Sequence, residues 1–317
     1  MSILYFLVQQ TMFFSIPLLI VALGGMFSER SGVINIALEG IMLSGAFTGI
    51  LFINIFQASI PGQPILFLAI LVSAATGVAV SLLHGYASIN LKANQIISGT
   101  AINMLAPALA IYIARIIRTV QQIPFTNQFR IEKAPVLGSI PFIGPLLFQN
   151  TYLTTFLGFL ILVFSTLLLY KTRFGLRLRS CGEHPQAADS AGINVYRMRY
   201  AGVMISGALA GLGGLVYIIP TSTEFNADVA GYGFLALAVL IFGQWKPLRI
   251  LVAAFFFGFM KVIASSYSGI AFLKSVPIPS YVYKMIPYIA TLVVLAFTSK
   301  RSQAPRAEGI PYDKGHR

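Results

Sequence analysis

Charged side chains are scarce in this sequence. Only 10% of its 317 residues are Asp, Glu, Lys or Arg, whereas 57% are hydrophobic. A soluble domain carries about 25% charged residues, because polar groups must cover much of its surface. The composition therefore excludes a soluble globular enzyme and a disordered chain, and it indicates a protein that lies in a lipid bilayer.

Cysteine and histidine are also rare. The single thiol, Cys181, has no second cysteine for an intrachain disulfide, which excludes a disulfide-stabilised secreted scaffold. The three histidines form no His-Glu-x-x-His zinc pair. The sequence also lacks a Gly-x-Ser-x-Gly nucleophile motif and a Gly-x-x-x-x-Gly-Lys-Ser/Thr phosphate-binding loop. We predict no catalytic residue, metal site or cofactor, so the energy for any transport must come from elsewhere.

Long hydrophobic runs take the place of charge. A helix needs about 20 apolar residues to cross a bilayer, and two shorter runs, 229–243 and 284–298, are expected to be tilted spans or re-entrant pieces. Runs of spanning length occur at 3–24, 33–54, 65–84, 95–117, 151–170, 200–220 and 248–266. We predict an all-α polytopic membrane protein of about nine helical elements, with residues 1–298 as the transmembrane domain and 299–317 as a tail.

The basic residues predict the orientation, because cytoplasmic loops carry the excess of Lys and Arg. If nine elements cross, one side holds only Arg118, Arg130, Lys133 and Lys274. The side of the C-terminal tail holds Arg30, Lys92, Lys171, Arg173, Arg177, Arg179, Arg197, Arg199, Lys246, Arg249, Lys300, Arg301, Arg306, Lys314 and Arg317. We therefore expect the N-terminus outside and the tail in the cytoplasm. Basic residues spread over many short loops also argue against nucleic-acid binding, although the net charge is +13.

The external connection, 118–150, contains four prolines and alternating apolar residues. It is expected to be either an ordered cap that offers a docking surface or a plain connector.

The cytoplasmic connection, 171–199, is predicted to contain a short helix at 185–191. Pro185 suits the first helical position, and Gly192 suits the left-handed residue that ends a helix. Such a short helix is unstable by itself in water. Its stripe of alanines, Ala187, Ala188 and Ala191, is expected to lie against a groove of a partner. The alternative is an ordinary basic loop.

The same connection carries a resemblance to a known family. Ala187-Ala188-x-x-x-Gly192 resembles the ATPase-contacting loop of binding-protein-dependent ABC importer permeases, with Gln186 in place of the acidic residue of the generic motif. The longer strings GEHPQAA (182–188), GINV (192–195) and SGALAG (206–211) resemble the simple-sugar and branched-chain amino-acid permease family. The resemblance assigns the ATPase-coupling loop to Gly182, Glu183, His184, Pro185, Ala187, Ala188 and Gly192.

Two further strings narrow the resemblance. Residues 29–47 (ERSGVINIALEGIMLSGAF) are similar to the nucleoside-uptake branch of that family, and 93–103 (ANQIISGTAIN) match it more weakly, with Gln95 at a position expected to be acidic. The resemblance implies a multi-pass permease of the cell (inner) membrane, not an enzyme. Its implied partners are membrane lipid, an ABC ATPase that binds and hydrolyses ATP, a second homologous permease with which it is expected to form a heterodimer, and an extracellular substrate-binding lipoprotein. Nucleosides are the expected substrate, with ribose-type sugars or branched-chain amino acids as alternatives; a proton-coupled secondary transporter is a further alternative.

Four polar residues within the apolar runs are candidates for the translocation path. If a helix starts at the Ser31-Gly32 turn, Glu39 lies eight residues inside it, about 12 Å deep, where a carboxylate must face a polar cavity, pair or protonate. Asn35 lies one turn before it, and Thr100 and Asn103 lie on another span. Two roles stay open: contact with substrate, or hydrogen bonds that hold helices together.

Overall fold

The computed structural model describes residues 3–135, 137–141, 144–266, 279–298 and 303–314. Seven helices in this part of the chain are long and apolar enough to cross a membrane. They are α1 (Ile3–Arg30), α2 (Leu38–Phe56), α3 (Gln63–Gly85), α4 (Gln95–Arg118), α5 (Leu153–Lys171), α8 (Val195–Thr221) and α10 (Pro247–Ser266). The two shorter runs form α9 (Tyr232–Phe242) and α12 (Ser280–Thr298). Every predicted apolar run is therefore helical over most of its length, and nine crossings stay a prediction.

The connection 118–150 contains most of the strand structure in the described chain. Strand β1 (Ile123–Pro124) pairs antiparallel with β4 (Glu224–Phe225), and β2 (Arg130–Lys133) pairs antiparallel with β3 (Gln149–Tyr152). A 3₁₀ turn (Leu137–Ser139) and a π-helical turn (Gly144–Phe148) lie between β2 and β3. This connection is thus an ordered cap rather than a plain connector, and its short strands are an addition to the predicted helical fold, which is confirmed for most of the described chain.

Helix α8 lies at the centre of the core and packs against α1, α2 and α3. Glycines permit the close approach of these backbones: a Cβ atom on Gly45 of α2 would overlap the backbone of Gly211 on α8, and one on Gly77 of α3 would overlap Gly207. Helix α4, by contrast, exposes large apolar side chains such as Ile97, Met104 and Tyr112. Helices α1 and α8 therefore form a buried core, while α4 has an open apolar face.

The start of α2 differs from the prediction. Helix α1 continues to Arg30, residues 31–37 are not helical, and α2 begins only at Leu38. The expected helix from residue 33, with Glu39 eight residues inside it, is therefore wrong: Glu39 lies in the first turn of α2. The reason lies far away in the sequence, because side chains of α3 and α4 supply the hydrogen bonds that a helix would otherwise make.

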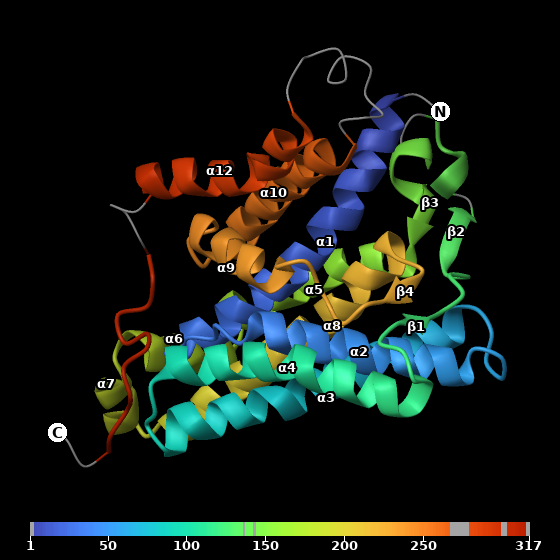
Figure 1. The fold of residues 1–317 in the computed structure, drawn as a ribbon. Helices are drawn as coiled ribbons and strands as arrows, with labels where there is room; N and C mark the ends of the chain where they lie inside the picture. Colours follow the sequence, from blue (N-terminus) through green and yellow to red (C-terminus); the bar gives the residue numbers. More distant parts are fainter. Residues whose placement is uncertain (1–2, 136, 142–143, 267–278, 299–302, 315–317) are drawn as a thin grey trace.

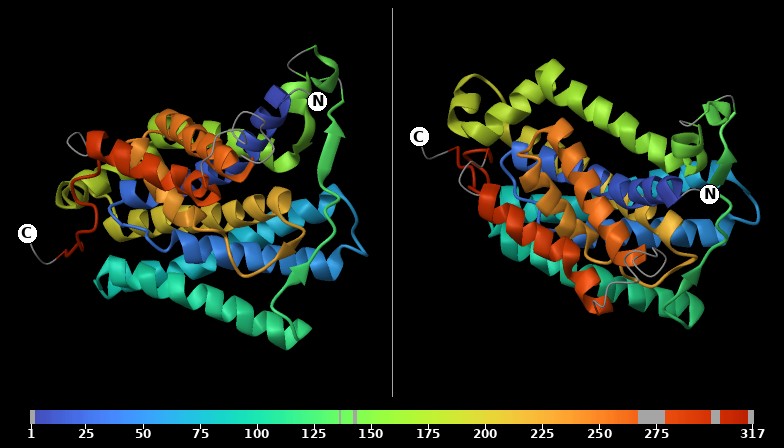
Figure 2. Two further views of the ribbon diagram at one scale, coloured as in Figure 1. Left: turned by 45° about the horizontal axis from the view of Figure 1, so that its top comes forward. Right: turned by 90° about the horizontal axis from the view of Figure 1, so that it is seen from above.

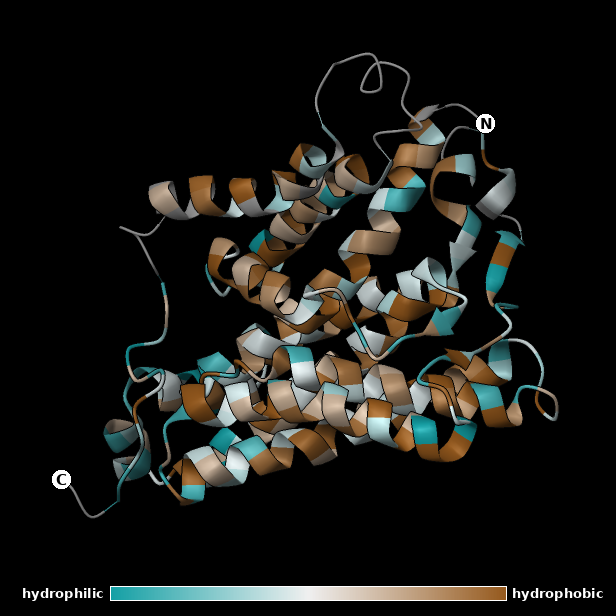
Figure 3. Cartoon of the chain, in the orientation of Figure 1, coloured by the Kyte–Doolittle hydropathy of each residue, from teal (hydrophilic) through white to brown (hydrophobic). Residues whose placement is uncertain are grey.

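The two ends of the molecule differ in character. The start of α1 lies near β2 and β3, whereas α6 (Arg173–Glu183), α7 (Pro185–Ser190) and residues 303–314 lie at the opposite end (Figures 1 and 2). Hydrophilic residues gather around α7 and the C-terminal segment, and hydrophobic residues dominate the helices (Figure 3). The two connections expected on opposite sides of the membrane thus lie at opposite ends of the fold.

Candidate functional site

The break between α1 and α2 is held by side chains from two other helices. Ile34 donates its N–H to Gln95 Oε1 of α4 and accepts from His84 Nε2 of α3, both over 2.8 Å. Asn103 Oδ1 accepts the Gly40 N–H over 2.8 Å, and its Nδ2 donates to the Ile36 carbonyl over 2.8 Å. Backbone groups inside a protein must be paired, so these polar side chains replace helical hydrogen bonds and fix the non-helical segment.

The break before α9 is held mainly by one carboxylate. Gly231 has a left-handed backbone (φ 72°) and donates its N–H to Glu39 Oε1 over 2.9 Å, while the Gly233 N–H donates to Glu39 Oε2 over 2.5 Å. A negative charge at a helix N-terminus interacts favourably with the aligned peptide dipoles. Since Glu39 also lies in the first turn of α2, it serves the N-termini of two helices.

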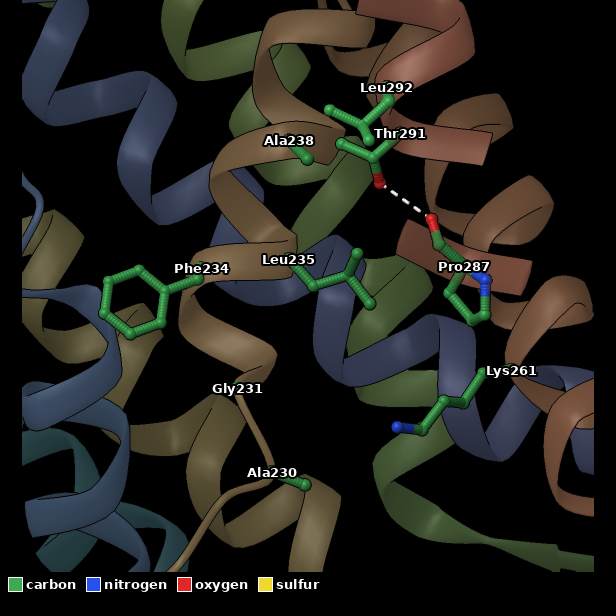
Figure 4. A pocket seen from close by; sticks show the side chains of 9 residues that line it. All are labelled: Ala230, Gly231, Phe234, Leu235, Ala238, Lys261, Pro287, Thr291 and Leu292. Carbon is green, nitrogen blue, oxygen red and sulfur yellow. Dashed lines mark hydrogen bonds between the residues drawn. The ribbon is translucent and has the colours of Figure 1, made fainter. Parts of the chain in front are cut away.

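A cavity of about 380 Å³ adjoins this second break, within the ~300–1,000 Å³ range of small-molecule sites. It is lined by Ala230, Gly231, Phe234, Leu235, Ala238, Lys261, Pro287, Thr291 and Leu292. Leu235 of α9 and Lys261 of α10 project into the same space, and Thr291 of α12 closes one side (Figure 4). The Lys261 ammonium lies 5.6 Å from the centre of the Tyr232 ring. The cavity thus offers apolar walls and one cationic hydrogen-bond donor.

The four residues predicted for the translocation path do not converge on one cavity. Glu39 caps α9, Asn103 bridges the first break, and Asn35 Nδ2 donates to Ser206 Oγ of α8 over 2.8 Å. Thr100 is exposed, and its hydroxyl donates to the Ile96 carbonyl of its own helix. Three of the four therefore hold helices together, and contact of any of them with substrate stays a prediction.

The predicted short helix at 185–191 is present as α7. Pro185 occupies its first turn, His184 Nδ1 accepts the Ala187 N–H over 3.2 Å, and Gly192 follows with φ 81°. Proline at the start and a left-handed glycine after the end were the signals in the sequence. The imidazole cap of His184 was not foreseen, because histidine is not a typical N-cap residue.

The alanines of α7 point in different directions, which corrects the predicted stripe. Ala187 and Ala191 are exposed, whereas Ala188 is only 4% exposed and packs with Cys181, Val195 and Tyr312. Residues one position apart on a helix cannot share a face. The surface that α7 offers to another protein therefore includes Ala187 and excludes Ala188.

The loop residues before α7 contact the end of α1. A Cβ on Gly182 would overlap the Arg30 carbonyl, so only glycine fits this contact. Arg30 Nη1 lies 3.5 Å from Glu183 Oε1. Burial raises the pKa of the Cys181 thiol to about 11, so this thiol is unreactive at neutral pH. The connection is thus packed onto the spans and is not a free loop.

Sequence reasoning missed several buried polar residues. His84 and Gln95 hold the first break, Trp245 Nε1 donates to Glu29 Oε2 over 2.5 Å, and Arg199 is only 1% exposed. Gln95 lies within residues 93–103, a string that resembles the permease family, and this position was a sign that the residue has a specific role. Arg199 gave no such signal, because a basic residue at a helix end normally reaches the membrane surface.

Comparison with known proteins agrees with these features. The family described as "Branched-chain amino acid transport system / permease component" matches residues 7–295. The chain is 45% identical to the guanosine ABC transporter permease protein NupQ of Bacillus subtilis, over 100% of this chain and 99% of that protein. It is 41% identical to the nucleoside ABC transporter permease protein NupC of Lactococcus lactis, over 98% of each chain.

A more distant relative comes from the same Lactococcus strain. The nucleoside ABC transporter permease protein NupB is 22% identical over 95% of this chain and 84% of its own length. One strain therefore has two unlike permeases that bear a nucleoside transporter name, and this chain resembles one of them far more than the other. No solved structure matches the chain.

Proposed function

The chain belongs to the permease family of branched-chain amino acid transport systems, and from this membership we propose that it is a transmembrane permease subunit of an ATP-driven importer of nucleosides. The observation that carries the proposal is 45% identity to a guanosine permease over the whole of both chains. A glucose permease relative from Haloferax volcanii, named as putative, is only 29% identical, which favours nucleosides over a simple sugar.

The importer we propose contains an ABC ATPase, a second and unlike permease and an external substrate-binding lipoprotein. The two unlike nucleoside permeases of one Lactococcus strain support the pairing. The basic residues favour an orientation with the strands outside and α7 in the cytoplasm, where α7 meets the ATPase. The chain itself performs no catalysis.

The path we propose runs beside α9, through the cavity between α9, α10 and α12. A nucleoside has an apolar base face and several oxygen acceptors, and the cavity combines apolar walls with the Lys261 ammonium. Broken helices at the substrate path are typical of transporters. In this role Glu39 positions α9 and lies behind the path.

Uptake in proteoliposomes that hold the whole importer tests substrate and energy source together. We expect ATP inside the vesicles to drive uptake of labelled guanosine, with competition by unlabelled nucleosides but not by ribose or leucine. A hydrogen bond to a charged group contributes about 1.5–3 kcal/mol, so Lys261→Met is expected to raise the KM for guanosine at least about tenfold. Uptake driven by a proton gradient without ATP would overturn the proposal. Competition by ribose or leucine would show that the substrate is a sugar or an amino acid instead of a nucleoside.

Docking of α7 on the ATPase is tested by a matched pair of substitutions. Ala187→Glu places a charge on the exposed face of α7 and is expected to abolish recovery of the ATPase in a pull-down while membrane abundance holds. Ala187→Ser, which adds a single small polar atom, is the control and is expected to retain the ATPase. Equal ATPase recovery with Ala187→Glu and with wild type would show that α7 is not the contact.

A further inference from the structure

The C-terminal residues 303–314, called here the tail strap, lie across the end of the molecule that carries α7 (Figure 1). Backbone hydrogen bonds attach the strap to two separate elements: the Ala307 N–H donates to the Gly182 carbonyl over 2.8 Å, and the Gly309 N–H donates to the Gly32 carbonyl over 3.2 Å. The Gln303 N–H donates to Gln244 Oε1 in the turn between α9 and α10 over 3.0 Å. The strap is therefore bound along its length.

A buried cation depends on the strap. Arg199 of α8 is 1% exposed, and its Nη1 donates to the Ile310 carbonyl over 3.0 Å. Its Nε and Nη2 atoms have no hydrogen-bond partner among the described residues. A buried charge without partners is strongly unfavourable. The strap carbonyl is thus a main source of stabilisation for Arg199.

The end of the strap completes a small core beneath α7. Tyr312 is 4% exposed and packs with Cys181 and Ala188, and its ring lies 5.5 Å from that of Tyr196 in an edge arrangement. Next to it, Asp313 Oδ2 accepts from the Lys92 ammonium over 2.7 Å, in the connection that follows α3. The buried face of α7 therefore rests on the strap, and the strap is tied to the connection between α3 and α4.

From these contacts we propose that the tail strap positions α7 and passes its displacement to the end of α1, to the start of α8 and to the connection between α3 and α4. The role in transport rests on the proposed docking of α7 on an ATPase. Helix α7 has only six residues and is bounded by His184 and Gly192, neither of which is helical. Non-helical residues change their backbone angles more easily than a helix does. A displacement of α7 would therefore bend the backbone at these two residues and would not move the neighbouring helices. The strap adds a second connection from α7 to the neighbouring helices, and this connection does not pass through His184 or Gly192.

The native thiol provides a reporter for strap attachment. Cys181 is the single cysteine of the chain, is 0% exposed and packs against Tyr312 of the strap. Burial raises its pKa to about 11, and alkylation requires the thiolate. Release of the strap exposes the thiol and lowers its pKa, so N-ethylmaleimide labelling of this chain is expected to accelerate.

Tyr312→Ala in the full importer tests the proposal, with Ile310→Ala as matched control, because Ile310 is a large apolar strap residue that is 56% exposed. We expect Tyr312→Ala to accelerate Cys181 labelling at least about tenfold, with ATPase recovery unchanged and guanosine transported per ATP hydrolysed at least several-fold lower. The control is expected to match wild type in all three. If Tyr312→Ala does not accumulate, Asp313→Asn neutralises the carboxylate that pairs with Lys92 and is expected to shift labelling and coupling in the same directions.

Two results overturn the strap role. Unchanged labelling in both Tyr312→Ala and Asp313→Asn would show that the strap does not cover α7. Faster labelling with an unchanged ratio of transport to hydrolysis would show that it covers α7 without passing motion. Absence of the ATPase from the wild-type complex would instead overturn the importer proposal, and the coupling role with it, while the labelling result would still decide whether the strap covers α7.

Discussion

The break before α2 and the break before α9 both interrupt the backbone hydrogen bonds of a helix, and side chains replace those bonds in different ways. Three side chains, His84, Gln95 and Asn103, share the first break, and each bonds the backbone directly. At the second break, Glu39 alone reaches in from another helix and accepts the Gly231 and Gly233 N–H groups, while the Tyr232 N–H donates to the nearby Val229 carbonyl. The first break is held by several groups, whereas the second depends largely on one.

This difference separates a fixed part of the molecule from a part that is able to move. The residues of the first break are mostly buried and lie against α8 of the core. The second break borders a cavity and exposes Ala230 and Phe234. Local opening requires little free energy where few contacts hold a segment. We therefore expect α9, rather than the start of α2, to shift during transport.

The largest expected effect comes from Glu39→Leu, which removes both acceptors at the second break. An unsatisfied buried donor costs about 1–3 kcal/mol, so loss of about 2–4 kcal/mol and failure of uptake are expected. Glu39→Gln keeps one oxygen acceptor but places its NH2 group opposite the other backbone N–H. We expect stability to fall by about 1–2 kcal/mol, with uptake retained. Thermal unfolding in detergent and guanosine uptake measure the two effects.

The Gln variant also distinguishes packing from proton coupling. A neutral amide retains shape and cannot exchange a proton, so proton-coupled transport would stop and lose its pH dependence. Uptake that fails in Glu39→Gln although its unfolding temperature stays near wild type would contradict the capping role.

The sequence predicted the positions of the helices better than their breaks. Apolar runs determine where a chain can cross a membrane, and the run at 284–298 did prove helical. Residues 33–37 belong to an apolar run of the same kind. They are not helical, because hydrogen bonds from distant side chains determine their backbone conformation. Such long-range partners leave no periodic pattern. The helix start predicted for the segment before Glu39 was wrong for this reason, and the depth of Glu39 in the membrane stays a prediction.

The coupling loop shows the same limit at smaller scale. Pro185 and Gly192 act on their own backbones, so the bounds of α7 could be predicted. Which alanine is buried depends on Tyr312, more than a hundred residues further along the chain, and the sequence gives no sign of that contact. The pattern of small residues therefore predicted a contact surface on α7, but not which of the alanines face outward.

The intermediate effect is expected for Asn103→Leu at the first break. The substitution removes the acceptor of Gly40 N–H and the donor to Ile36, for an expected loss of about 1–3 kcal/mol. His84 and Gln95 remain in place, so the break should persist and uptake should continue at reduced protein abundance. The thermal unfolding midpoint reports the loss, and a fall as large as that of Glu39→Leu would contradict the comparison between the two breaks.

The smallest effect is expected for Thr100→Ala, one turn from Asn103 on the same helix. The Thr100 hydroxyl donates to the Ile96 carbonyl of its own helix, and the residue is exposed. Exposed substitutions of this kind change stability by less than about 0.5 kcal/mol, so unfolding and guanosine uptake should both match wild type. Thr100→Val, which keeps the shape and removes the hydroxyl, is the control. Reduced uptake at unchanged stability in both variants would show that the exposed face of α4 contacts substrate or the second permease, and the path would then extend beyond the cavity beside α9.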